Sequence, residues 1–139
     1  MRRLAGRIGD ERGAVLVAGL LLALALLIVI GAGADIAHAF IVRRQLVSVA
    51  DDAALTGSQA LDLQALHQGR LALDPEQARS AALQTLAAEP GLSSQASADA
   101  ADVHVDVHRT MPTILLRLVG ISTLTVAAHA TAAPREPEP

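Results

Sequence analysis

The hydrophobic and polar positions of this 139-residue chain follow three successive patterns. The first is an unbroken apolar run: residues 14–34 carry no charge, and 12 of these 21 residues are Leu, Ile or Val. A helix of this length spans roughly 31 Å, close to the thickness of the hydrocarbon core of a bilayer. Leu, Ile and Val each favour insertion by ~0.3–0.6 kcal/mol. The run therefore predicts a transmembrane helix at residues 14–34.

Two other interpretations of this run stay open. A buried core helix requires a large soluble domain around it, and the rest of the chain is short and rich in alanine. A cleavable signal peptide fits the small-residue triplets at 32–34 and 37–39, although its apolar part is usually only ~7–15 residues long. Cleavage there predicts a small secreted soluble protein, released by signal peptidase, as the alternative to a membrane anchor.

The placement of arginines predicts the orientation of the span. Four arginines precede it in a leader of residues 1–13, whereas Arg43 and Arg44 are the only two that follow it closely. Because positively charged flanks stay inside, we expect a cytoplasmic amino terminus and a single pass through the cytoplasmic membrane. Everything after residue 34 is then expected to be extracytoplasmic.

The second pattern is a helical repeat. Residues 35–62 contain no proline and one glycine, so the helix is expected to continue outside the membrane. A stripe of mostly small residues recurs on one side of this continuation: Ala39, Val42, Leu46, Val49, Ala53, Thr56 and Ala60. One interpretation packs this stripe on the carboxy-terminal part of the same chain. The other makes it an assembly seam for helices of neighbouring proteins.

A second short helix and a polar connection are expected within residues 63–101. Asp74 is a capping residue, Pro75 suits the first helical position, and residues 89–91 (Glu-Pro-Gly) end the helix. The polar run 92–101 is expected to be a mobile connection.

The third pattern has a period of two and fills residues 102–133. Valines alternate with polar residues from position 103, and residues 123–132 alternate again, with a proline-started, glycine-ended turn between them. Residues 134–139 are expected to be a disordered tail. The predicted fold class is α+β: a long N-terminal transmembrane helix extended outside the membrane, a second short helix and a small two-stranded β element.

Composition argues against several kinds of chemistry. The chain has no cysteine, and its net charge of −3 provides no basic face for nucleic acid. No motif of a hydrolase, a nucleotide-binding loop or a metalloprotease occurs, so we expect no enzyme, no cofactor and no small-molecule substrate. His104, Asp106 and His108 would share one strand face at ~6.5–7 Å spacing. A metal-binding exported protein is a third alternative, but a solvated strand face explains the same spacing and no metal site is predicted.

Several spaced elements of the first half of the chain form a recognisable set. They are a glycine that closes the leader, an aspartate after the apolar run, a basic pair and the segment ADDAALTG; the positions are Gly13, Asp35, Arg43, Arg44, Asp51, Ala53, Ala54, Leu55 and Gly57. With these elements, residues 12–61 resemble the amino-terminal region of TadE/TadG-like proteins of the Flp (Tad) pilus assembly system. Residues 103–132 are similar to the family's strand, turn and closing strand.

The resemblance implies a pilin-like, non-enzymatic membrane component of a Flp/Tad-type pilus assembly or secretion apparatus, of the short kind found beside secretion ATPases. Pilin or platform proteins of that apparatus are the implied partners, through helix–helix packing. The family pattern also implies a glutamate five residues after the processing glycine, where this chain has Ala18. Because this glutamate is missing, we expect the helix to stay in the membrane as an anchor and not to be processed into a filament subunit.

Overall fold

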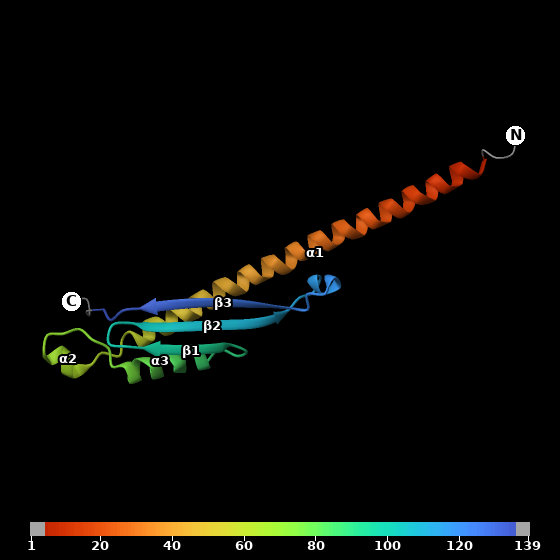
Figure 1. The fold of residues 1–139 in the computed structure, drawn as a ribbon. Helices are drawn as coiled ribbons and strands as arrows, with labels where there is room; N and C mark the ends of the chain where they lie inside the picture. The colour runs from red at the N-terminus through yellow and green to blue at the C-terminus, as the bar shows by residue number, and fades with distance from the viewer. Residues whose placement is uncertain (1–4, 136–139) are drawn as a thin grey trace. The chain divides into compact units, whose positions relative to one another are not determined.

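The computed structural model describes the backbone of residues 5–135 and the side chains of residues 13–135. Residues 1–4 and 136–139 lie outside the described residues, and with them Arg2, Arg3 and most of the expected tail. The elements in chain order are α1 (Ala5–Gly57), α2 (Leu63–His67), α3 (Pro75–Ala87), β1 (Ser93–Ala98), β2 (Val103–Pro112), the 3-10 helix η1 (Leu116–Val119) and β3 (Thr123–Ala132) (Figure 1). The α+β fold class is confirmed.

The chain divides into two compact units. The first unit contains Met1–His38 and Pro112–Ser122, and the second contains Ala39–Met111 and Thr123–Pro139. Helix α1 contributes its first part to the first unit and its last turns to the second.

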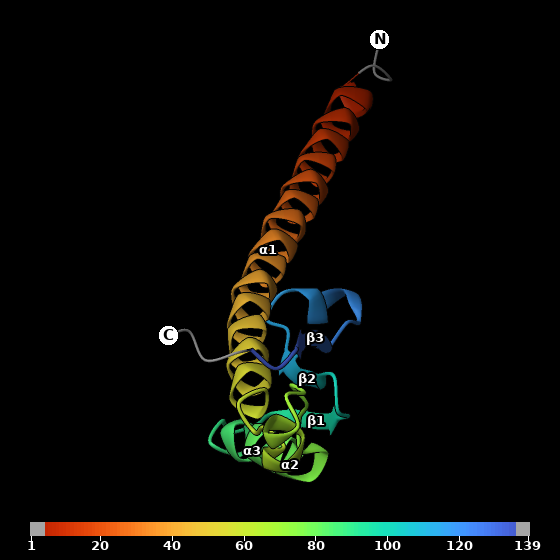
Figure 2. The same ribbon diagram turned by 90° about the vertical axis from the view of Figure 1, so that its left-hand side faces the viewer.

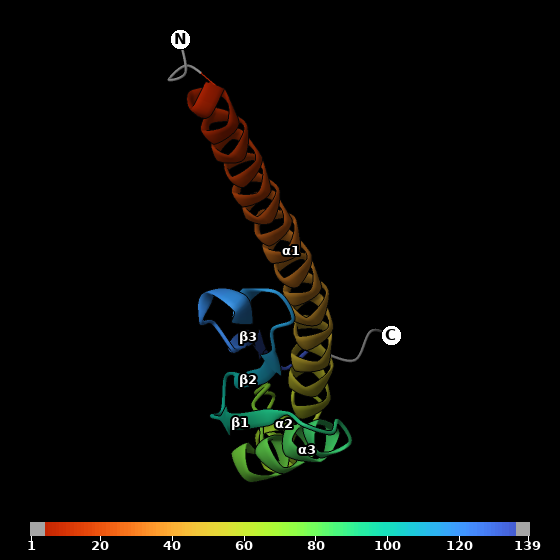
Figure 3. The same cartoon turned by 90° about the vertical axis from the view of Figure 1, so that its right-hand side faces the viewer.

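In the first unit, most of the apolar part of α1 is uncovered. Its large side chains are exposed, for example Leu16 at 73% and Ile30 at 74%, and no residue of its most apolar stretch is buried. Among the described residues, α1 is the one helix that is long and apolar enough to cross a membrane. The same unit contains the turn of η1, which is seen beside α1 in Figure 3.

In the second unit, a three-stranded sheet is covered on one face by helices. The strand order is β1-β2-β3, and β1 pairs antiparallel with β2 so that Ser93 lies opposite His108 and Ala98 opposite Val103. The last turns of α1 and helix α3 pack on the sheet (Figure 2), because β2 and β3 place alternate apolar residues on that face. The shared core contains Val42, Leu46, Ala50, Ala53, Ala54, Leu73, Ala78, Ala82, Leu86, Val103, Val105, Val107, Val126, Ala128 and Ala130.

The sheet has three strands and not the two expected. The polar run 92–101 was expected to be a mobile connection, but Ser93–Ala98 forms β1 on the edge of the sheet. The residues of the sequence SSQASA have little preference for strands, so the local sequence does not predict a strand at this position. Pairing with β2 and contact with α3, including a 3.2 Å hydrogen bond from Arg79 Nε to the Ala96 carbonyl, hold the strand in place.

The helices follow their local signals. Asp74 caps α3 by accepting from the N–H groups of Glu76 and Gln77, each at 3.1 Å, and Pro75 is the first helical residue, as expected. Helix α2 was not expected; its cap is Asp62, which accepts from Gln64 N and Ala65 N. Helix α1 ends at Gly57, five residues before the expected end of the continuation.

Candidate functional site

Asp35 is the polar centre of the first unit. It follows the apolar run directly, yet its side chain is buried, with 8% exposed. One carboxylate oxygen accepts a hydrogen bond from Ile114 N at 3.1 Å, and the other accepts from Leu115 N and Leu116 N, each at 2.8 Å. The residue before η1 offers no capping side chain of its own. Asp35 therefore supplies, from a helix about 80 residues away in sequence, the acceptors that η1 lacks.

These contacts keep Asp35 ionised. The N–H of Leu116 is the largest cause that lowers the pKa of Asp35, while removal from water opposes it. The N–H groups of Ile114 and Leu115 and the charge of His38 lower the pKa further. The carboxylate is therefore charged at neutral pH and is matched by donors.

The segment that Asp35 holds is closed on itself. We call residues 113–122 the outer loop. At its base Thr113 N donates to the Ser122 carbonyl at 3.0 Å, and the Thr113 hydroxyl donates to the Ile121 carbonyl. Just before this base Gly120 adopts a positive φ of 92°, which ends η1 and suits glycine. Backbone and side-chain hydrogen bonds between its two ends thus close the outer loop.

The outer loop also packs directly on the backbone of α1. A Cβ built at Gly31 would lie 2.7 Å from Leu115 Cβ, so a side chain at position 31 would collide with the loop. Gly31 lies four residues before Asp35, which corresponds to about 6 Å along a helix. The contact therefore falls within the last turns of the apolar run.

The rest of the outer loop presents apolar side chains outward. The exposed fractions are 76% for Ile114, 64% for Leu118, 52% for Val119 and 47% for Ile121. Arg117 is exposed among them. A cluster of branched apolar residues on one short loop is the usual mark of a surface that meets lipid or another protein.

In the second unit, the stripe of small residues on α1 lies mostly inside. Val42, Leu46 and Ala53 belong to the core, and Ala39, Val49 and Ala60 pack against it in partly buried positions. Thr56 is exposed, and its hydroxyl donates to the Asp52 carbonyl at 2.8 Å. This arrangement is the packing on the protein's own carboxy-terminal part; an assembly seam made by the same residues stays a prediction.

The family-motif positions separate into inward and outward groups. Ala53, Ala54 and Gly57 face the core, and a Cβ at Gly57 would lie 2.8 Å from the Ala78 carbonyl oxygen. The outward positions are Arg43, Arg44, Asp51 and Leu55. Gly13, like Ala18, lies exposed on α1. The segment ADDAALTG (residues 50–57) thus has one face buried in the core of the second unit and one face that is exposed.

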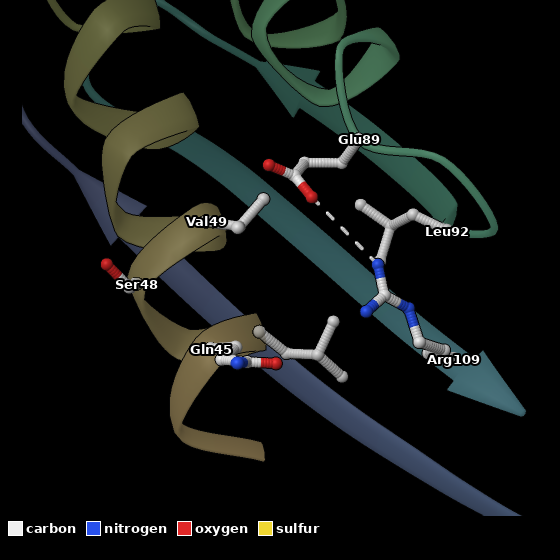
Figure 4. Close-up of a pocket in the computed structure, with 7 residues that line it drawn as sticks. Gln45, Ser48, Val49, Glu89, Leu92 and Arg109 are labelled. Carbon is white, nitrogen blue, oxygen red and sulfur yellow. Dashed lines mark ion pairs between the residues drawn. The ribbon is translucent and has the colours of Figure 1, made fainter. Parts of the chain in front are cut away.

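A pocket of about 380 Å³ lies within the second unit, between α1 and the turn after α3 (Figure 4). Its lining residues are Gln45, Leu46, Ser48, Val49, Glu89, Leu92 and Arg109. Arg109 Nη2 lies 4.0 Å from Glu89 Oε2 and donates to the Pro90 carbonyl at 3.1 Å, whereas Arg109 Nε is buried without a partner. Arg109 was not predicted as a site residue, although the alternation from Val103 places position 109 on the inner face of β2.

The candidate metal group lies on the opposite face of the sheet. His104, Asp106 and His108 are all exposed, and His104 Nδ1 is 3.1 Å from the Thr131 hydroxyl oxygen. Within the part of the chain that the structure describes, no three His, Asp or Glu side chains are placed to share a metal ion. The alternation of these residues is explained by a solvated sheet face.

The fold and these surfaces define a class: an α+β protein on one long helix whose first part is apolar enough to cross a membrane. The comparison with protein families makes this specific, because the family model for Tad-like Flp pilus assembly matches residues 36–132. The chain belongs to this family and is a pilus-assembly component. Comparison with curated proteins and with solved structures gives no significant match.

Proposed function

We propose that this protein is a non-enzymatic, single-pass component of the cytoplasmic membrane in a Flp/Tad-type pilus assembly or secretion apparatus. The observation that carries the proposal is the uncovered apolar part of α1 in a chain whose remainder matches a pilus-assembly family. The amino terminus is cytoplasmic, and the second unit is extracytoplasmic. The protein acts by binding pilin or platform proteins.

Contacts on both sides of the first candidate cleavage site support retention of the anchor. Gly31 and Asp35 hold the outer loop together, and the triplet 32–34 lies between them. Cleavage after Ala34 would remove Gly31 from its contact with Leu115 and would turn Asp35 into the amino terminus. A retained helix preserves both contacts.

The intact mass of the protein from membranes tests this part of the proposal. We expect a mass that includes residues 14–34. A mature chain that begins at Asp35 or Phe40 would show that signal peptidase releases a soluble protein, and it would eliminate the anchor.

The partner surface is proposed for the outward side of α1 in the second unit. Most of the small-residue stripe packs in or against the protein's own core, so exposed side chains of the same helix are the better-placed contacts for a partner helix. Phe40 and Ile41 are 62% and 57% exposed, and they lie six and seven residues after the end of the proposed span. Large apolar side chains exposed on a helix are typical anchors for a neighbouring helix.

The double variant Phe40→Glu/Ile41→Glu tests this surface. We expect it to lose copurification with pilin and platform proteins from detergent-solubilised membranes. The thermal stability of its second unit should stay unchanged, because both residues are exposed. Ser48→Glu, an exposed position on the same helix, is the matched control and should retain the partners. Unchanged copurification of the double variant would remove Phe40 and Ile41 from the binding surface.

A further inference from the structure

We infer that the outer loop inserts into the outer leaflet of the membrane beside α1 and that its exposed side chains contact lipid acyl chains. The inference rests on the proposed membrane anchoring and deepens it. It gives the protein a second point of contact with the bilayer, about 80 residues after the anchor helix in sequence.

The depth of the loop follows from its contacts within the first unit. Leu115 meets the α1 backbone at Gly31, and Ile114, Leu115 and Leu116 bond to Asp35. If residues 14–34 span the bilayer, Gly31 lies about 4–5 Å inside the outer end of the apolar run, which is residue 34. Leu115 then lies at the level of the lipid headgroups and the first acyl carbons.

The side chains of the loop fit this depth. Ile114, Leu118, Val119 and Ile121 are half to three-quarters exposed, although a loop in water normally carries polar residues. Arg117 is exposed on the same loop, and its long side chain can keep the guanidinium at the phosphate level while its neighbours enter the apolar layer. Branched residues around one arginine are suited to an interface between water and lipid.

Most backbone N–H groups of the loop have an acceptor within the protein. Unsatisfied backbone N–H and C=O groups are costly at membrane depth, and irregular backbone does not face lipid within the hydrocarbon core, so the loop backbone belongs at the headgroup level with its side chains reaching inward. The loop N–H groups with an acceptor in the structure are those of Thr113, Ile114, Leu115, Leu116, Leu118, Gly120 and Ile121. Asp35 takes three of them, and so one carboxylate removes the main desolvation cost of the turn that enters η1.

Single-cysteine variants of the full-length protein test the inference, since the native chain contains no cysteine. Leu118→Cys reports on the outer loop, Leu24→Cys on the proposed span and Ser97→Cys on the exposed side of β1. Each variant is labelled with an environment-sensitive fluorophore and reconstituted in vesicles of phosphatidylcholine and phosphatidylglycerol. Emission is compared between vesicles with ordinary and with brominated acyl chains, which quench only fluorophores in contact with them.

We expect the label at position 118 to emit at shorter wavelength than the label at position 97 and to be quenched by lipids brominated close to the headgroup. The label at position 24 should be quenched most by bromine deep in the acyl chain. A label at 118 that behaves like the one at 97, while position 24 is quenched, would overturn the inference and leave the anchor intact. Absence of quenching at position 24 would refute the membrane anchoring itself.

The role of Asp35 is tested in the same system. Asp35→Ala in the Leu118→Cys background removes the acceptors of the loop, and we expect weaker and more variable quenching at position 118. The same substitution combined with Leu24→Cys should leave the quenching at position 24 unchanged. Full quenching at position 118 in the Asp35→Ala variant would show that the loop reaches lipid without this carboxylate.

Discussion

The two parts of helix α1 solve different burial problems with one continuous backbone. From residue 14 to 34 branched apolar side chains point in all directions, and nearly all of them are exposed. From residue 39 onward one side is buried in the core, and the other side carries exposed polar residues such as Arg43, Arg44 and Asp52 together with a few exposed apolar ones. An all-round apolar surface suits a lipid environment, and a one-sided one suits a protein core beside water.

The size of the side chains separates the two parts as well. The buried face of the second part includes Ala50, Ala53 and Ala54 at 0–1% exposure, which lets the sheet approach the helix closely. In the first part, Gly31 is the glycine whose added Cβ would meet another side chain; Gly19 and Gly33 have open space. A small residue on this helix is therefore not by itself evidence of a protein contact: Gly31 packs against another segment of the chain, whereas Gly19 and Gly33 do not.

The largest effect is expected for the free energy of unfolding, when a core residue and a surface residue of the second part of α1 are each truncated. Leu46→Ala should lower the free energy of unfolding by about 2–5 kcal/mol, because the side chain is 1% exposed and its loss leaves a cavity. Leu55→Ala, at 45% exposure on the same helix, should change it by less than about 0.5 kcal/mol. Denaturant unfolding of the full chain in detergent, followed by circular dichroism, measures both. Similar losses for the two variants would contradict the assignment of the stripe to the core.

A charge introduced in the first part of α1 should reduce membrane insertion of the helix. Leu24→Arg should weaken membrane insertion by about 2.5–3.5 kcal/mol, because an arginine at the centre of a span is poorly solvated. Carbonate extraction of membranes measures the fraction that remains integrated. Leu55→Arg on the exposed side of the second part is the control and should remain integrated as fully as the native protein. Equal extraction of both variants would argue against lipid around the first part.

The glycines of the apolar run allow a matched comparison. Gly31→Ala should destabilise the contact with the outer loop by about 1–3 kcal/mol, since the new Cβ overlaps Leu115. Gly33→Ala meets nothing within 4 Å and should be neutral or stabilise the helix by up to about 1 kcal/mol. Amide hydrogen exchange of residues 114–116 is the readout, and faster exchange in Gly31→Ala alone is expected. Identical exchange in the two variants would mean that the close contact is absent.

The smallest effect is a dependence of the outer loop on pH. Because hydrogen bonds lower the pKa of Asp35 in the folded protein, its stabilisation is fully present above the ordinary aspartate pKa of ~3.9 and is lost as the pH falls through the lower folded value. His38, one turn further along α1, is the neighbouring charge that acts on it. Exchange protection at residues 114–116 should therefore fall in acid in the native chain. In Asp35→Asn it should be weaker at neutral pH and should not show this transition.

Several elements could be predicted because their signals are local. The apolar run, the capped helix α3, the alternating strands β2 and β3 and the glycine-ended turn each depend on neighbouring residues. Strand β1 could not, because SSQASA has no apolar alternation of its own and becomes a strand only by pairing with β2. The inward position of Arg109 was available from the alternation of β2 but carried no chemical signal by itself.

The sequence alone determined the length and apolar character of the membrane-compatible helix, the α+β class and the family resemblance, since each follows from composition and spacing along the chain. Tertiary structure decided which surface the small-residue stripe meets and what Asp35 binds. The partners of both are far away in sequence: the stripe packs on strands after residue 102, and Asp35 bonds to backbone N–H groups at 114–116. Periodicity shows that a helix face will be buried, but only the folded chain determines what covers it.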